Sequence, residues 1–127
     1  MGKNEDKIIS EAKPHTEKKF RLVEKYVEAW AYKLLNNKYC NKLTFIDCMC
    51  NSGEYVDIDG NQVFGTPVRV AKILREAAQK YPNKKVYLLL NDMSLKKIEH
   101  LKTLINTEGQ SNYCVKFDHE DANVLLK

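Results

Sequence analysis

Three short apolar segments, separated by longer amphipathic ones, constrain the fold of this chain most strongly. The short segments are residues 43–49, 86–90 and 113–117, and each is rich in residues that favour strands. Between them, apolar residues recur every three or four positions, which is the spacing of an amphipathic helix. Strands that alternate with helices in this way form a parallel sheet with right-handed crossover connections.

A leading helix is predicted ahead of the first strand. It begins near Thr16 and runs to about Asn36. Its apolar residues lie three or four positions apart and form one stripe that we expect to be buried. The stripe consists of Phe20, Val23, Val27, Trp30 and Leu34.

Two crossover helices and the start of a further one are also predicted. The crossover helices begin near Pro67, a favoured first-turn residue, and at Ser94, a favoured cap. The second is expected to end at Gly109, and another helix opens at residues 123–126. Residues 86–90 are apolar in succession rather than alternately, so we expect helices on both faces of the sheet.

The expected fold class is therefore α/β, with a Rossmann-like parallel sheet of about three strands and a leading amphipathic helix. Residues 1–14 are polar and rich in lysine and glutamate, and we interpret them as a flexible leader. Residues 15–127 then form the N-terminal part of the domain. Because the third strand would be left as an unpaired edge, we expect a truncated product, a fragment, or a component that a partner completes.

The composition excludes several classes of protein. The leader has no apolar block of the secretory type, and no apolar run approaches the 20 or so residues that span a membrane, so a cytoplasmic protein is expected. A net charge of +4 is compatible with nucleic acid but comes without a dense basic patch. The four cysteines lack the spacing of a zinc site and are expected to be free thiols.

Polar residues follow each of the three predicted strands. Asp47 closes the first strand and begins a loop that ends at Gly53, Asp92 follows the second strand, and Asp121 follows the third. Because the carboxyl ends of parallel strands face one crevice, these residues are expected to surround one ligand. Asp92 can accept hydrogen bonds from two ribose hydroxyls, and Asp121 from an adenine amino group. Asp47 is expected to orient the loop or to meet an ammonium group.

The loop after the first strand points to a ligand without phosphates. A G-x-G-x-x-G fingerprint is absent, since Gly53 is the one glycine of the loop. Residues 55–64 place Asp59-Gly60 between two short alternating segments, which predicts a hairpin before the next helix. A pyrophosphate would therefore lack a helix N-terminus beside the loop. S-adenosylmethionine has no phosphate and fits these requirements.

Several of these segments resemble a known family. Residues 14–16, 26–30, 45–47, 52–55, 65–67 and 89–92 are similar to the three-Cys-motif partner protein family, and the similarity covers about residues 13–127. The resemblance implies a class I methyltransferase-like fold and S-adenosylmethionine as the cofactor. It also implies a partner protein that carries the three-Cys motif.

The resemblance also assigns candidate residues. The family has an Asp-Gly-Phe-Ala-Gly-Pro-Gly-like turn where this chain has residues 47–53, with Cys48 and Asn51 in place of glycines. Asparagine tolerates a positive φ, so the turn is expected to form. Asp92 falls on the acidic ribose-binding position. The expected cofactor-binding residues are Asp47, Cys48, Met49, Asn51, Gly53, Asp92, Met93, Asp121 and Ala122.

Three functional interpretations remain open at this point. The first is a methyltransferase-like domain whose acceptor is a nucleic acid or a protein, with catalytic residues that the sequence does not identify. The second is a non-catalytic scaffold that keeps the fold and binds a partner protein. The third is a nicotinamide-dependent enzyme, because an acid after the second strand also suits a nicotinamide ribose.

Overall fold

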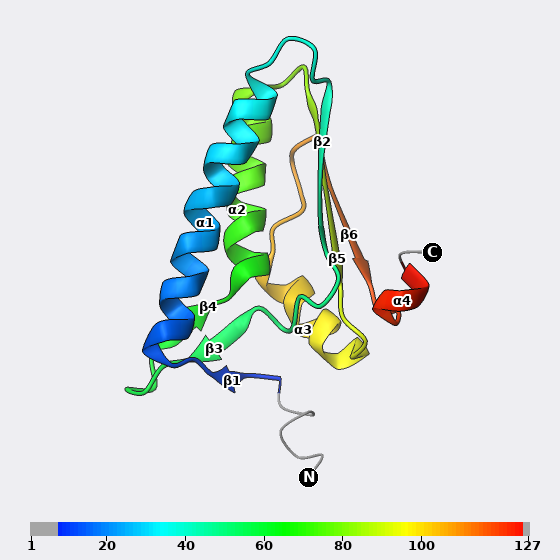
Figure 1. Cartoon of the computed structure of the whole chain (residues 1–127). Coiled ribbons are helices and arrows are strands. Elements are labelled where there is room, and N and C mark those ends of the chain that lie inside the picture. Colours follow the sequence, from blue (N-terminus) through cyan, green and yellow to red (C-terminus); the bar gives the residue numbers. More distant parts are fainter. Residues whose placement is uncertain (1–7, 126–127) are drawn as a thin grey trace.

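Each predicted apolar segment forms a strand of one parallel sheet. The structure is a computed structural model that describes residues 8–125. The strands are β2 (Lys42–Asp47), β5 (Lys85–Asn91) and β6 (Tyr113–Asp118), in the spatial order β2-β5-β6. Both pairings are parallel, so the predicted α/β class and its parallel sheet are confirmed (Figure 1).

The predicted helices form, with changes at their ends. They are α1 (Pro14–Leu35), α2 (Thr66–Lys80), α3 (Leu95–Leu104) and the single turn α4 (Ala122–Leu125). The expectation of a buried stripe on the leading helix is wrong in part, because Val27 is buried with Ala31 and Leu35 whereas Val23 is exposed. Of the described helices, none is long and apolar enough to cross a bilayer.

The two ends of α3 illustrate what local sequence does and does not determine. Ser94 caps the helix as predicted, because its hydroxyl accepts from the N–H of Lys97 at 3.4 Å. The predicted end at Gly109 is wrong, since the helix stops at Leu104. Ile105 is already extended, with a φ of −112°, and its buried side chain joins the core. Tertiary packing ends this helix before the glycine does.

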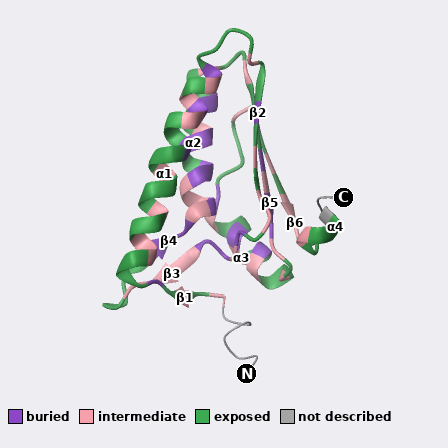
Figure 2. Ribbon diagram, in the orientation of Figure 1, coloured by how far each residue is buried: buried purple, intermediate pink, exposed green. Residues whose placement is uncertain are grey.

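One face of the sheet is covered. Leu43, Val86 and Tyr113 lie in one row across the three strands and are all buried. They belong to a single core cluster with buried residues of α1, α2 and α3. Figure 1 shows α1 and α2 on the same side of the sheet, and Figure 2 shows α1 mostly exposed and α2 with most of the buried residues of the two helices.

The other face is open within residues 8–125, so the expectation of helices on both faces is wrong for this part of the chain. Ile46 is 47% exposed and Tyr87 is 36% exposed, and both point away from the core side of their strands. The interpretation failed because Tyr87 and Leu89 are apolar residues on an uncovered face. The successive apolar residues of β5 do not mark burial on both sides.

The predicted hairpin forms a second, smaller sheet. Its strands are β3 (Glu54–Val56) and β4 (Gln62–Phe64), which pair in antiparallel fashion. Gly60 lies in the connecting turn with a φ of 81°, a conformation that glycine adopts without steric cost. The carboxylate of Glu54 contacts Nε2 of His100 on α3 at 2.8 Å and ties the hairpin to the main body.

The segment ahead of α1 also takes part in this small sheet. β1 (Ser10–Glu11) runs parallel to β3, and the N–H of Ala12 donates to the carbonyl of Val56 at 2.7 Å. Ala12 is fully buried. The expectation of a polar leader over residues 1–14 is therefore corrected for its described part, and residues 1–7 lie outside the description.

Candidate functional site

The loops that follow the three parallel strands meet around one pocket of about 330 Å³. Six predicted ligand-binding residues line it, and they come from all three loops. Glu120 and Asn123 complete the lining, and neither was among the predicted site residues. The pocket is lined by Cys48, Met49, Asp92, Met93, Glu120, Asp121, Ala122 and Asn123.

Asn91 holds the three loops together, although it was not among the predicted site residues. Its side-chain amide donates to the carbonyl of Cys48 at 3.0 Å and to that of Glu120 at 2.9 Å. Its amide oxygen accepts from the N–H of Glu120 at 2.9 Å. The residue is fully buried, and a buried amide needs partners of this kind. A polar residue at the end of an apolar strand was the available signal.

Asp92 faces the first loop, as predicted. Its Oδ2 accepts from the N–H of Asn51 at 2.9 Å, and its Oδ1 accepts from the N–H of Ser94 at 2.9 Å. The carboxylate thus joins the first loop to the start of α3. A carboxylate offers about four lone-pair sites, so two further hydrogen bonds can be accepted.

Asn51 and Gly53 shape the first loop from behind the pocket and do not line it. Asn51 has a φ of 64°, which confirms that this position needs a residue that tolerates the left-handed region. Its side chain donates to the hydroxyl of Tyr55 at 2.9 Å and accepts from the N–H of Ser52 at 2.8 Å. Gly53 has a φ of 82° and packs tightly against Leu101.

Asp47 also lies outside the pocket lining. Its carboxylate accepts from the N–H of Met49 at 3.2 Å, which fits the predicted role of orienting the loop. Burial raises the pKa of Asp47, the hydrogen bond from Met49 opposes that shift, and the nearby charge of Asp92 adds to it. The ionised form of Asp47 is therefore disfavoured relative to an exposed aspartate.

The cysteines of the first loop differ in position. All four cysteines of the chain are free thiols, as predicted. Cys48 lines the pocket, whereas Cys50 is buried on the core side. Burial, with the charges of Asp47 and Asp92, raises the pKa of the Cys50 thiol well above its ordinary range, so this thiol is not a nucleophile at neutral pH. Within residues 8–125, no three metal-ligating carboxylate, imidazole or thiol groups cluster together.

The loop after β6 forms an exposed wall of the pocket. Glu120 and Asp121 are exposed, and Asp121 accepts from the N–H of Asn123 at 2.8 Å. With Asp92, these residues place three carboxylates around the pocket. Their charge favours a cationic or hydrogen-bond-donating ligand and disfavours a phosphate.

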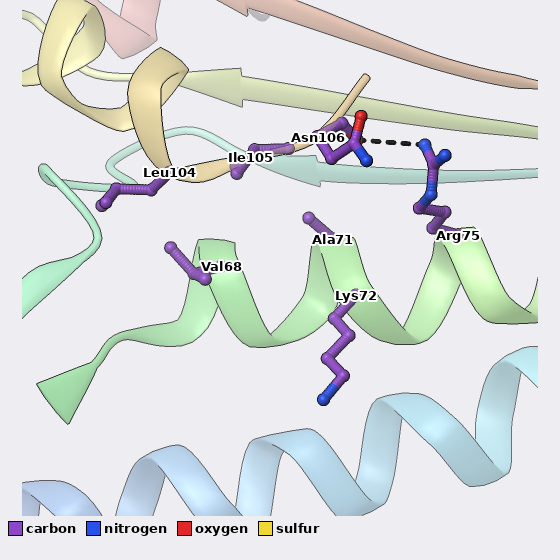
Figure 3. Close-up of a pocket in the computed structure, with 7 residues that line it drawn as sticks. All are labelled: Val68, Ala71, Lys72, Arg75, Leu104, Ile105 and Asn106. Atoms are coloured by element: carbon purple, nitrogen blue, oxygen red, sulfur yellow. Dashed lines mark hydrogen bonds between the residues drawn. The ribbon is translucent and has the colours of Figure 1, made fainter. Parts of the chain in front are cut away.

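A second cavity lies between α2 and the chain that follows α3 (Figure 3). It has a volume of about 220 Å³ and is mostly aliphatic. The guanidinium of Arg75 is already used there, since it donates to the carbonyl of Asn106 at 3.2 Å and to that of Glu108. The cavity brings together no acid, base and nucleophile, so the strand-end pocket is the better candidate.

Comparison with known proteins assigns no family to this arrangement. No protein-family model, no curated protein and no solved structure matches the chain.

Proposed function

We propose that this chain binds S-adenosylmethionine as the N-terminal portion of a Rossmann-like, methyltransferase-like domain of the three-Cys-motif partner type. The methyl acceptor would be a nucleic acid or a protein. The observation that carries the proposal is the meeting of three strand-end loops around one pocket, with Asp92 bonded to the first loop. Ligands of parallel α/β sheets bind in this position.

The chemistry of the lining favours this ligand over a dinucleotide. Asp92 keeps two acceptor sites for ribose hydroxyls after its two main-chain bonds. Asp121 is exposed beside it and can accept from an adenine amino group. The sulfonium of S-adenosylmethionine is positive, whereas the pyrophosphate of a nicotinamide dinucleotide would meet three carboxylates. Helix α2 begins beyond the hairpin, so its N-terminus does not offset that repulsion.

A binding scaffold is the second candidate, and one observation favours it. Both oxygens of Asp92 already accept main-chain hydrogen bonds, which gives this residue a structural role without any ligand. Cys48 also places a side chain in the pocket where the family has glycine. In this alternative the pocket binds no cofactor, and the domain binds a partner protein.

Calorimetric titration with S-adenosylhomocysteine separates the two candidates. We expect a dissociation constant on the order of 1–100 μM for the unchanged chain. Ala122→Trp fills the pocket and should weaken binding about tenfold or more, which is at least 1.4 kcal/mol. Ala29→Trp adds the same side chain at an exposed position of α1 and should leave binding unchanged.

Two results would reject the cofactor proposal. The first is the absence of heat with a chain that circular dichroism shows to be folded, which would favour the scaffold. The second is equal binding by Ala122→Trp and Ala29→Trp, which would mean that the ligand binds elsewhere. Displacement of S-adenosylhomocysteine by NAD at similar concentration would instead support a nicotinamide enzyme.

A further inference from the structure

The open face of the central sheet has an apolar centre. This face consists of the outward-pointing residues of β2, β5 and β6. In one row Thr44, Tyr87 and Cys114 lie opposite one another, and in the next row Ile46 lies opposite Leu89. Parallel sheets are ordinarily covered by helices on both faces, because each face presents apolar side chains. Within residues 8–125, no helix covers this one.

Lysines surround that centre on all three strands. Lys42 and Lys85 are opposite one another at the start of their strands, and Lys116 lies opposite Leu89. All three are exposed. Among the outward-pointing strand residues that the structure describes, Asp118 at the carboxyl end is the one carboxylate. The open face is therefore apolar in the middle and positive at its margins.

We propose that the open face binds an amphipathic helix from outside residues 8–125, whose apolar stripe is flanked by glutamate or aspartate. The apolar stripe would cover Ile46, Tyr87 and Leu89, and the acidic flanks would pair with Lys42, Lys85 and Lys116. A helix is the element that normally covers a parallel sheet, and the charge pattern specifies an acidic one. The proposal is independent of the strand-end pocket and of the ligand proposed for it.

A second copy of the chain does not fit the charge pattern. The most exposed apolar residues of its helices include Leu22 and Tyr26 of α1, which are 70% and 73% exposed. Their exposed neighbours on the helix include Lys18, Arg21 and Lys25. Basic flanks would face the lysines of the open face, and like charges at close range oppose docking.

A nucleic acid fits less well than an acidic helix. The lysines could contact phosphates, but sequence-independent binding of single strands also uses several aromatic rings on which bases stack. Tyr87 is the one aromatic residue among the outward-pointing residues of the three described strands. The remaining centre of the face is aliphatic and would be left without a partner.

Two synthetic peptides test the proposal on the full chain. Each has about 18 residues, five helical turns, and one leucine stripe. The first carries glutamates on both sides of the stripe, and the second carries lysine at every glutamate position. We expect the acidic peptide to bind with a dissociation constant on the order of 1–100 μM and the basic peptide to bind at least tenfold more weakly. Added salt should weaken the binding of the acidic peptide, because it screens the ion pairs.

The exposed thiol of Cys114 reports where the peptide binds. At about ten times the dissociation constant, alkylation of Cys114 should slow roughly tenfold, because only the unbound fraction reacts. Cys40 lies in the connection between α1 and β2, outside the apolar centre of the open face, and its alkylation should slow less than that of Cys114. Peptide mapping by mass spectrometry gives both rates in one sample.

Charge and shape variants complete the test. Leu89→Glu should abolish binding of the acidic peptide, and Lys116→Glu should weaken it about tenfold and strengthen the basic one. Lys19→Glu makes the same charge change on α1 and should have no effect. Because Lys116 and Lys19 are both exposed, these two variants are expected to fold.

Four results would overturn the proposal. They are equal binding of the two peptides, binding of neither, binding that leaves Cys114 unprotected, and binding that Lys19→Glu weakens as much as Lys116→Glu. Protection of Cys114 by oligothymidylate but not by the acidic peptide would assign the face to nucleic acid. Protection that grows with protein concentration alone, with a dimer in sedimentation, would assign it to a second copy.

Discussion

The two ends of the central sheet are each held by an asparagine, yet only one end forms a candidate site. At the amino end, the Asn112 amide donates to the carbonyls of Ala78, Tyr81 and Lys84, at 2.8, 3.1 and 2.7 Å. At the carboxyl end, Asn91 makes three bonds to the loops after β2 and β6. Both asparagines therefore join chain segments through hydrogen bonds between a side-chain amide and main-chain groups.

The two ends differ in the polar side chains that surround each asparagine. The amide of Asn112 contacts carbonyls next to helix and strand ends, and Asn112 lines neither the strand-end pocket nor the cavity beside α2. Around Asn91 the loops leave Asp92, Glu120 and Asp121 facing a pocket. The buried amide of Asn91 is thus architectural, whereas the carboxylates beside it keep further acceptor sites and are the groups available to a ligand.

The largest expected effect comes from Gly53, which packs against the core behind the pocket. A Cβ there would lie 2.6 Å from Leu101 Cδ1 and 2.8 Å from Val68 Cγ2, at a φ of 82°. Gly53→Ala should lower the free energy of unfolding by about 2–4 kcal/mol, through strain and overpacking together. Urea denaturation measures the loss.

Gly60 supplies the matched control. Its φ is 81°, but no atom lies within 4 Å of the Cβ position. Gly60→Ala should therefore cost only about 1 kcal/mol, the backbone part of the effect. Equal losses for the two variants would mean that the close packing around Gly53 contributes nothing.

The next largest effect is expected from replacing each of the two asparagines by alanine. Asn91→Ala leaves the carbonyl of Cys48 and both main-chain groups of Glu120 without their partner, and should cost about 2–4 kcal/mol in unfolding free energy. Asn112→Ala should cost about 1–3 kcal/mol. Only Asn91→Ala should also weaken the binding of S-adenosylhomocysteine. Calorimetric titration at temperatures below the unfolding transition measures this affinity. A similar loss of affinity in both variants would remove the distinction between the two ends.

Sequence patterns predicted the elements that depend on neighbouring residues. The strands, the cap at Ser94 and the hairpin turn at Gly60 follow from periodicity and from local backbone preferences. The positive φ of Asn51 was expected because the family that the sequence resembles has glycine at this position of its turn. For the same reason the strand ends, and so most of the pocket residues, could be named in advance.

Features that depend on distant parts of the chain were not predicted. The role of Asn91 requires the loop after β6, which lies far along the sequence from Cys48. β1 forms only because β3 offers an edge beside it. The open face was missed because apolar residues such as Tyr87 and Leu89 look the same in the sequence whether or not a helix covers them.

A smaller effect is expected in the exposed wall of the pocket. Asp121→Ala removes one hydrogen bond, to the N–H of Asn123, at an exposed position. Its unfolding free energy should change by less than about 0.5 kcal/mol. Its affinity for S-adenosylhomocysteine should nevertheless fall about tenfold, the value of one hydrogen bond to a charged acceptor. A stable variant with unchanged affinity would exclude Asp121 from the adenine site.

The smallest expected effect is a gain in stability at Asp47. Because burial raises its pKa in the folded chain, the ionised carboxylate lowers stability at neutral pH. The penalty is present above the raised pKa and disappears as the pH falls through it toward the ordinary value. Asp47→Asn removes the charge and can still accept from the N–H of Met49, so it should unfold at higher urea concentration than the unchanged chain at pH 7.

That gain should shrink as the pH is lowered from about 7 to about 4, since the unchanged chain then becomes protonated at Asp47. A gain that stays constant with pH would mean that Asp47→Asn acts through packing and not through charge. Combining it with Asp92→Asn sharpens the test, because the charge of Asp92 contributes to the raised pKa. In that background the gain from Asp47→Asn should be smaller, which would show that the carboxyl end of the sheet holds two coupled carboxylates ahead of any ligand.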